Sequence, residues 1–279
     1  MTTIADALKQ ARQRIAPISE SASLDAQVLL AEMLGKDRAF LLAHSDESLT
    51  PEQAARYAAL VERRAAGEPI AYILGRRAFY DREFIVAPGV LIPRPETELL
   101  LEAALQFAAG RSSVTAADIG TGSGALAVTF AVHCPQATVY AVDISPQALE
   151  IARHNADLHG TTINFLAGDL LQPLVERGIK VGVLMANLPY IASGDLPSLA
   201  VSQYEPHLAL DGGPDGLDLI RRLLADLRRV CDPGALALLE IGADQGESCR
   251  NLVRQMIRPQ QLNILKDYAG LDRIVRIVL

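Results

Sequence analysis

The stretch Asp118-Ile-Gly-Thr-Gly-Ser-Gly-Ala125 decides the fold, because it joins an apolar segment to one with helical periodicity. Its glycines let the backbone turn tightly and approach a ligand at the N-terminus of the following helix. Nineteen residues past Gly124, Asp143 ends the next apolar segment, where a carboxylate can accept both hydroxyls of a ribose. The residues predicted to bind a cofactor here are Gly120, Thr121, Gly122, Ser123, Gly124 and Asp143. The pattern Gly120-x-Gly122-x-x-Ala125 also fits a dinucleotide fingerprint, so a nicotinamide or flavin remains open on these residues alone.

Outward from this loop, strand and helix patterns alternate from residue 114 to the end of the sequence. The expected strands are Val114–Ile119, Thr138–Val142, Thr162–Leu166, Val181–Ala186, Ala235–Ile241, Asn263–Leu265 and Ile274–Leu279. Helices are expected near 99–109, 124–133, 146–158, 215–231 and 245–257. Such alternation predicts an α/β fold with a mostly parallel sheet and helices on both faces. The short connection before the seventh strand predicts a final antiparallel hairpin.

The first part of the chain has a different pattern. Residues 1–75 show helical periodicity, and Thr50-Pro-Glu-Gln53 has the residues of a helix start with a capping box. Short β runs follow at 78–80, 83–86 and 90–92, separated by turn residues. We therefore expect a small helical bundle over 1–75, a β-hairpin linker over 76–95 and a sheet domain over 96–279.

Composition excludes several classes of protein. Half of the 279 residues are hydrophobic, which is enough for a folded core, and no apolar run approaches the ~18 residues of a membrane span. The 26 Lys and Arg against 33 Asp and Glu leave a net charge of −7, which argues against nucleic acid as a partner. The three cysteines and five histidines lack the spacing of a disulfide framework or a metal site. The start lacks the continuous apolar region of a signal peptide, so a cytoplasmic location is expected.

Two further strand ends carry candidate site residues. Asp169 follows the third expected strand and can accept the exocyclic amine of an adenine, although a loop acid or a helix cap fits the spacing equally well. The fourth strand ends in Asn187-Leu-Pro-Tyr190. The Asn187 side-chain oxygen and the Leu188 carbonyl can accept the two N–H bonds of a planar NH2 group, and Tyr190 can stack on its plane. An ordinary strand-ending turn is the alternative for this tetrapeptide.

Taken together, these motifs resemble the class I S-adenosylmethionine-dependent methyltransferases that act on amino groups. Pro69–Gly75 and Val90-Leu-Ile-Pro-Arg-Pro-Glu-Thr-Glu98 narrow the resemblance to the PrmC/HemK family, the glutamine-N5 methyltransferases of peptide chain release factors. The likeness covers essentially the whole chain. It implies a Rossmann-like methyltransferase domain over 96–279, a substrate-recognition role for 1–75, S-adenosylmethionine as cofactor, no metal, and a monomer acting on release factors.

The resemblance also implies roles for individual residues. The glutamine of the Gly-Gly-Gln loop would be held by the catalytic and substrate-binding residues Asn187, Leu188, Pro189 and Tyr190. The cofactor would contact Asp169, Leu170 and Asn187 in addition to the glycine loop and Asp143. The chain departs from the family at Leu188, where proline is usual, and at Leu170, where an aromatic residue often packs on the adenine.

Three other functions compete with this interpretation. An adenine-N6 methyltransferase of ribosomal RNA or DNA would use the same Asn-x-Pro-Tyr chemistry on a flipped base. A nicotinamide oxidoreductase would explain the glycine loop but not Asn187–Tyr190. A non-catalytic binding module would follow if Leu188 had disabled the site. Glu96 and Glu98 are expected to serve the start of a helix, and Glu205 to position a loop.

Overall fold

The computed structural model describes residues 2–279. Contacts between Cα atoms divide the chain into two compact units, with the boundary between Arg76 and Arg77. The first unit contains the expected helices, and the second contains the sheet.

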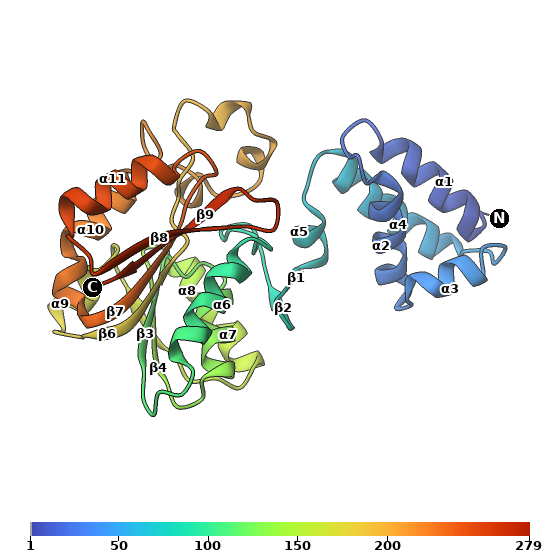
Figure 1. Ribbon diagram of the computed structural model, residues 1–279. Helices are drawn as coiled ribbons and strands as arrows, with labels where there is room; N and C mark the ends of the chain where they lie inside the picture. Colours follow the sequence, from blue (N-terminus) through green and yellow to red (C-terminus); the bar gives the residue numbers. More distant parts are fainter. Residues whose placement is uncertain (1) are drawn as a thin grey trace. The chain divides into compact units, whose positions relative to one another are not determined.

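The first unit is a bundle of helices joined by loops (Figure 1). Its helices are α1 (Ile4–Ile15), α2 (Ala22–Leu34), α3 (Arg38–Ala43), α4 (Pro51–Ala65) and α5 (Ile70–Leu74). The capping box expected at Thr50 and Gln53 is present at the start of α4. Ile15, Leu29 and Leu41 are fully buried in the core of the bundle. The short helices α3 and α5 have no counterpart among the sequence expectations, because they are too short to show a period.

The second unit is built on a seven-stranded sheet in residues 77–279, with strand order β5-β4-β3-β6-β7-β9-β8. The strands are β3 (Thr115–Ile119), β4 (Thr138–Asp143), β5 (Asn164–Ala167), β6 (Val181–Ala186), β7 (Cys231–Glu240), β8 (Gln261–Lys266) and β9 (Asp272–Val278). All neighbours are parallel except β9, which is antiparallel to both β7 and β8. The α/β class and the final antiparallel hairpin are thus confirmed. From β3 the chain adds β4 and β5 on one side, and then β6 and β7 on the other side of β3. The switch between β3 and β6 is the place where such folds bind ligands.

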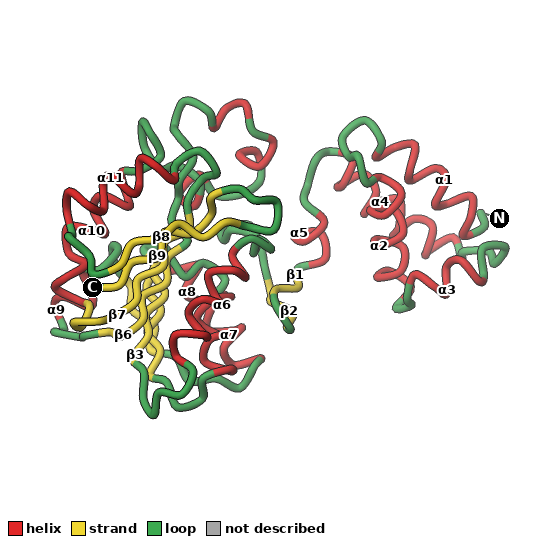
Figure 2. The backbone as a smooth tube through the Cα atoms, viewed as in Figure 1, coloured by secondary structure: helices red, strands yellow, loops and turns green. Residues whose placement is uncertain are grey.

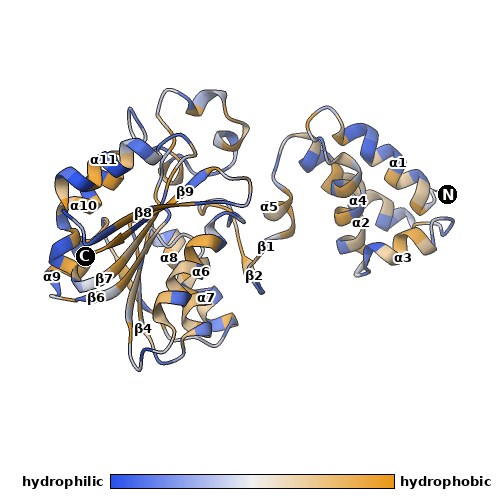
Figure 3. Cartoon of the chain, viewed as in Figure 1, coloured by the Kyte–Doolittle hydropathy of each residue, from blue (hydrophilic) through white to orange (hydrophobic). Residues whose placement is uncertain are grey.

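Helices cover both faces of this sheet (Figures 1 and 2). One face is covered by α6 (Thr97–Ala108), α7 (Ala125–His133) and α8 (Pro146–Leu158), and the other by α9 (Gln172–Glu176), α10 (Asp218–Val230) and α11 (Gly246–Met256). A buried apolar cluster lies under each layer. Figure 3 shows the strands as the hydrophobic centre, with hydrophilic residues on the outer sides of the helices. Burial on both faces explains why the strands have nearly continuous apolar sequences.

A small hairpin precedes the sheet, formed by β1 (Arg76–Phe79) and β2 (Arg82–Ile85). Phe79 and Phe84 are buried edge-to-face, with ring centroids 6.1 Å apart, in the cluster under α6 and α7. The expected β run at 90–92 was wrong, because these residues form a loop. The N–H of Ile92 is donated to the Glu205 carboxylate at 3.0 Å instead of to a neighbouring strand. Val90 and Ile92 are both buried, so this apolar run reflects a buried loop and not a strand.

Candidate active site

A cavity of about 340 Å³ opens where β3, β4, β5 and β6 end. Most of the site residues expected from the sequence line it, although they come from four separate strand ends. These lining residues are Gly120, Thr121, Gly122, Ser123, Asp143, Asp169, Leu170, Asn187, Leu188 and Pro189. Gly124 and Tyr190 are the two expected residues outside this wall. The fold therefore brings together, at one edge of the sheet, groups that are spread over about 70 residues of sequence.

The glycine loop is tied to the end of β4. Asp143 accepts the Gly122 N–H at 2.8 Å through one carboxylate oxygen and the Ser145 N–H at 2.9 Å through the other. Gly124 serves packing, since a Cβ there would lie 3.0 Å from the Cβ of Ala152 in α8. Burial raises the pKa of Asp143, although both N–H donors oppose that shift. The loop and this carboxylate thus form one preorganised wall of the cavity.

Asp118, the last but one residue of β3, is a second carboxylate in the cavity wall. Its Oδ2 accepts the Thr121 hydroxyl at 2.6 Å and the Ala127 N–H at 3.2 Å. Among residues 2–279, no group hydrogen-bonds to the other oxygen, Oδ1. Burial, with a smaller contribution from the charge of Asp143, raises the pKa of Asp118 to about 7. A buried carboxylate with one oxygen unpaired is suited to a cationic ligand group.

Asp118→Asn is expected to stabilise the ligand-free protein at pH 8. The folded pKa lies above the unfolded value, so the stabilising contribution of Asp118 is complete below pH about 4 and is lost as the pH rises through about 7. The asparagine removes this buried charge, and the melting temperature should rise about 2–4 °C for each kcal/mol regained. Thermal unfolding at pH 8 and pH 5 tests this, and the difference in melting temperature between the variant and the unmodified protein should be smaller at pH 5. Equal melting temperatures at pH 8 would contradict the buried charge.

Asp169 and Leu170 occupy the turn after β5. Asp169 forms an ion pair with Arg222 of α10, and both residues line the cavity. Leu170 has a positive φ of 47° and packs against the core beneath α10. The sequence did not reveal Arg222 as a neighbour of Asp169, because 53 residues separate them.

Asn187 and Leu188 present two oxygen atoms at the end of β6. Asn187 Nδ2 donates a hydrogen bond to the Thr97 hydroxyl at 3.0 Å. Within residues 2–279, neither Asn187 Oδ1 nor the Leu188 carbonyl accepts a hydrogen bond. Both residues line the cavity. This pair of acceptors matches the two N–H bonds of a primary amide.

Leu188 lines the cavity, and its side chain is packed into the core. Leu188 is 4% exposed and belongs to the apolar cluster beneath α10 and α11. Its Cδ2 lies 3.2 Å from where a Cβ on Gly120 would be, so it also packs against the glycine loop. The rigidity that proline would supply at this position is replaced by burial of leucine.

Leu188→Ala is expected to lower the free energy of unfolding by about 2–5 kcal/mol, because the truncation leaves a cavity in the core. The substrate contact expected of Leu188 uses its backbone carbonyl, so kcat at 20 °C should stay within about threefold of the unmodified protein. Chemical denaturation and steady-state kinetics measure the two quantities. An unchanged unfolding free energy would mean that Leu188 does not anchor this turn.

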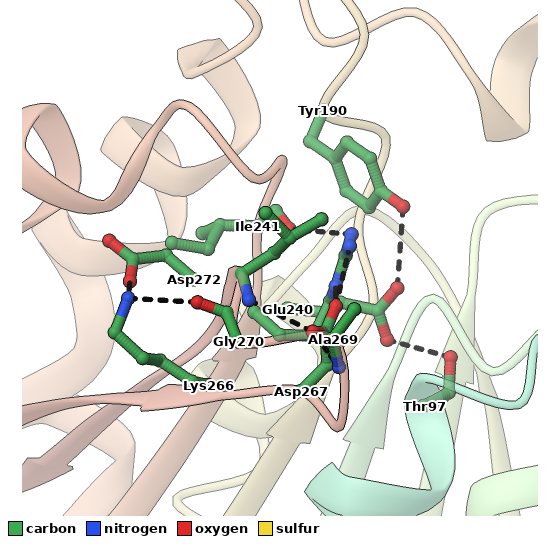
Figure 4. Close-up of polar contacts among 11 residues, drawn as sticks. Thr97, Tyr190, Glu240, Ile241, Lys266, Asp267, Ala269, Gly270 and Asp272 are labelled. Atoms are coloured by element: carbon green, nitrogen blue, oxygen red, sulfur yellow. Dashed lines mark hydrogen bonds and ion pairs between the residues drawn. The ribbon is translucent and has the colours of Figure 1, made fainter.

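Tyr190 lies outside the cavity wall that Asn187 lines. Its backbone carbonyl accepts the Gln245 Nε2 at 2.9 Å, and its hydroxyl is 3.4 Å from Glu240 (Figure 4). Burial raises the pKa of Tyr190 to about 12. Its side chain is thus held by contacts of its own next to the proposed acceptor site.

Sequence reasoning missed three buried polar residues around the site. Thr97 of α6 and Glu240 of β7 are 5% and 1% exposed, and their hydroxyl and carboxylate are 2.6 Å apart (Figure 4). Asn155 of α8 donates to the Ser123 and Ile85 carbonyls and accepts the Ile85 N–H. It therefore fastens the hairpin and the glycine loop to one helix. Only Glu240 carried a sequence signal, as a polar residue among apolar neighbours; Thr97 and Asn155 stand in polar stretches.

The segment before α6 is held by an ion pair. Arg94 is 2.6 Å from Glu205, which also accepts the Ile92 N–H and is 4% exposed. Glu205 thus contacts the loop at two points. Glu98 accepts the Tyr80 N–H at 2.9 Å.

Two absences within residues 2–279 bear on other site classes. No group of three or more His, Cys, Asp or Glu side chains there is arranged to hold a metal ion. None of the helices in this range is both long enough and apolar enough to cross a membrane.

Comparison with known proteins identifies both parts of the chain. Residues 6–75 match the PrmC N-terminal domain, and residues 116–205 match a methyltransferase domain. A methyltransferase from Pyrococcus furiosus has the same fold, with a TM-score of 0.52 and 18% identity over 80% of this chain and 98% of that one.

Two relatives match nearly the full length. A release factor glutamine methyltransferase of Moorella thermoacetica is 45% identical over 275 residues, which are 97% of this chain and 96% of the relative. One from Bordetella pertussis is 41% identical over 253 residues, or 90% and 93% of the two chains. The resemblance found in the motifs is thereby confirmed. The chain belongs to the release factor glutamine methyltransferase family.

Proposed function

We propose that this protein transfers a methyl group from S-adenosylmethionine to the side-chain amide nitrogen (N5) of the glutamine in the Gly-Gly-Gln loop of a peptide chain release factor. Family membership supports the reaction and the substrate. The observation that carries the proposal is the pair of unpaired oxygens, Asn187 Oδ1 and the Leu188 carbonyl, at the wall of the cavity. A glutamine amide has two N–H bonds for these two acceptors.

The cavity residues fit S-adenosylmethionine. The unpaired Oδ1 of Asp118 suits the ammonium group of its amino-acid end, and Asp143 suits the two ribose hydroxyls. Asp169 and Leu170 would receive the adenine amine and ring, with Arg222 sharing the Asp169 carboxylate. When bound, S-adenosylmethionine supplies a methyl group that is already activated by a positively charged sulfur.

The residues of the chain act by positioning. An amide nitrogen is a poor nucleophile because its lone pair is delocalised into the carbonyl group. Asn187 and Leu188 would hold both amide hydrogens and so orient the nitrogen, while Pro189 fixes the turn. The surplus amide proton leaves after transfer. Orientation of this kind supplies roughly 7–11 kcal/mol of the barrier in well-aligned cases, so no metal is required.

The same proposal covers the other parts of the chain. Residues 1–75 would recognise the release factor, a role supported by the match of 6–75 to the PrmC N-terminal domain. Residues 76–95 would act as a hairpin linker before the methyltransferase domain at 96–279. We propose a monomer that works in the cytoplasm, where release factors meet ribosomes.

Methyl transfer from isotopically labelled S-adenosylmethionine tests the acceptor class. We expect label in a purified release factor and none in ribosomal RNA or adenine-containing duplex DNA. Label in nucleic acid alone would favour the adenine-N6 alternative, which the names of the relatives do not favour. Enhanced NADH fluorescence on binding would instead revive the oxidoreductase alternative.

A further inference from the structure

A chain of three side chains runs from the cavity into the core and ends at a carboxylate. Asn187 Nδ2 is 3.0 Å from Thr97 Oγ1, which is 2.6 Å from Glu240 Oε2. Glu240 Oε1 lies 3.4 Å from the Tyr190 hydroxyl, so both carboxylate oxygens face hydroxyl groups (Figure 4). Thr97 and Glu240 are almost completely buried; Thr97 lies in the wall of the cavity, and Glu240 lies behind it in the core. These hydrogen-bonded side chains link α6, β7 and the end of β6.

The direction of these hydrogen bonds follows from the number of protons available. An ionised carboxylate can only accept, so the single hydroxyl hydrogen of Thr97 is donated to Glu240. Thr97 Oγ1 then offers only lone pairs to Asn187, and the Asn187 NH2 group must face it. The Asn187 Oδ1 is consequently turned toward the cavity.

We propose that Thr97 and Glu240 are positioning residues that fix the orientation of the Asn187 amide, so that it presents an oxygen and not an NH2 group to the substrate amide. This inference rests on the proposed function of Asn187. Neither residue touches the substrate, and both act through Asn187. The rest of the cavity wall cannot perform this task, because Thr97 is the hydrogen-bond partner of Asn187 Nδ2 within residues 2–279.

Reversal of the hydrogen-bond chain shows why the carboxylate matters. A protonated Glu240 can donate to Thr97, whose hydroxyl hydrogen is then free to bond Asn187 Oδ1. The Asn187 amide would rotate and turn its NH2 group toward the NH2 group of the substrate. Two donors facing each other form no hydrogen bond, so the substrate amide would lose one of its two acceptors.

Several charged or titratable groups surround Glu240. Thr97 and Tyr190 contact it directly, Arg273 of β9 attracts its negative charge, and Glu96 repels it. Arg273 is itself paired with Asp267 at 3.0 Å. Burial is the largest influence and raises the pKa of Glu240 to about 7. The orientation of Asn187 with Oδ1 toward the cavity is therefore fully populated well above pH 7 and is lost as the pH falls through about 7.

Substitutions at Thr97 test the role of the hydroxyl in the full-length protein. Thr97→Val keeps the shape and removes the hydroxyl, and we expect kcat for release-factor methylation to fall about tenfold. Thr97→Ser keeps the hydroxyl and should stay within about threefold of the unmodified protein. Thr129→Val is the matched control, because Thr129 is fully buried in α7 and its hydroxyl has no partner. S-adenosylmethionine affinity, measured by calorimetry, should be unchanged in all three.

The pH profile tests Glu240. At saturating S-adenosylmethionine, which removes the effect of Asp118 on affinity, kcat of the unmodified protein should rise as the pH increases through about 7. Glu240→Gln should lose this rise, because a glutamine does not titrate and can present either an oxygen or an NH2 group to Thr97.

Other outcomes would overturn the inference without touching the proposed function. Equal kcat for Thr97→Val and the unmodified protein would show that the Thr97 hydroxyl does not orient Asn187. Equal losses of kcat in Thr97→Ser and Thr97→Val would show that Thr97 acts through packing alone. A rise through pH 7 that persists in Glu240→Gln would assign the titration to another group. If the unmodified protein methylates no release factor, the proposed function itself fails.

Discussion

Asn187→Ala is expected to lower kcat about 10²–10³-fold while S-adenosylmethionine affinity changes by less than about twofold. The substitution removes Oδ1, one of two unpaired acceptors at the end of β6, so the substrate amide is no longer oriented. The glycine loop, Asp118 and Asp143 keep their own hydrogen bonds. Single-turnover kinetics and calorimetry measure the two effects separately.

Asn164→Ala is a matched control for this experiment. Asn164 is exposed in the edge strand β5, and its amide bonds the Val139 carbonyl, outside the cavity. This variant should keep full turnover. If Asn187→Ala instead strongly weakened cofactor affinity and kept kcat at saturation, Asn187 would belong to the cofactor site and not to the acceptor site.

Asp143→Ala is expected to show the opposite pattern, with S-adenosylmethionine affinity falling about 100-fold and kcat at saturation within about threefold. The substitution removes the proposed acceptor of the ribose hydroxyls. It also leaves the N–H groups of Gly122 and Ser145 without their partner, which loosens the glycine loop.

Calorimetric titration of S-adenosylmethionine measures the effect, and thermal unfolding checks that the protein remains folded. Asp143→Asn is the matched variant, because its amide oxygen can still accept one of the two N–H bonds, and its loss of affinity should be smaller. Unchanged affinity in Asp143→Ala would remove this carboxylate from the ribose site.

Local sequence was sufficient for the sheet and for most of the cavity wall. The glycine loop, Asp143, Asp169 and Asn187 each follow a strand, and parallel strands place their carboxyl ends at one edge. Prediction therefore needed only the strand positions and the rule that such edges bind ligands.

Pairings between distant residues could not be predicted in this way. Thr97 and Glu240 are 143 positions apart, and Ile92 and Glu205 are 113 apart, so no spacing reveals their contacts. The error at 90–92 has the same origin, because the Ile92 N–H bonds the distant Glu205 carboxylate and not a neighbouring strand. Leu188 shows that a departure from a motif can be compensated by packing that the motif does not contain.

The central claim is that the amide nitrogen of one release-factor glutamine receives the methyl group. Mass spectrometry of peptides from a release factor, incubated with this protein and S-adenosylmethionine, tests it most directly. We predict a gain of about 14 Da on the glutamine side chain of the Gly-Gly-Gln loop, much slower to appear with Asn187→Ala and absent from a release factor with alanine in place of that glutamine. The same gain on another residue, or no gain from a protein that binds S-adenosylmethionine, would contradict the claim.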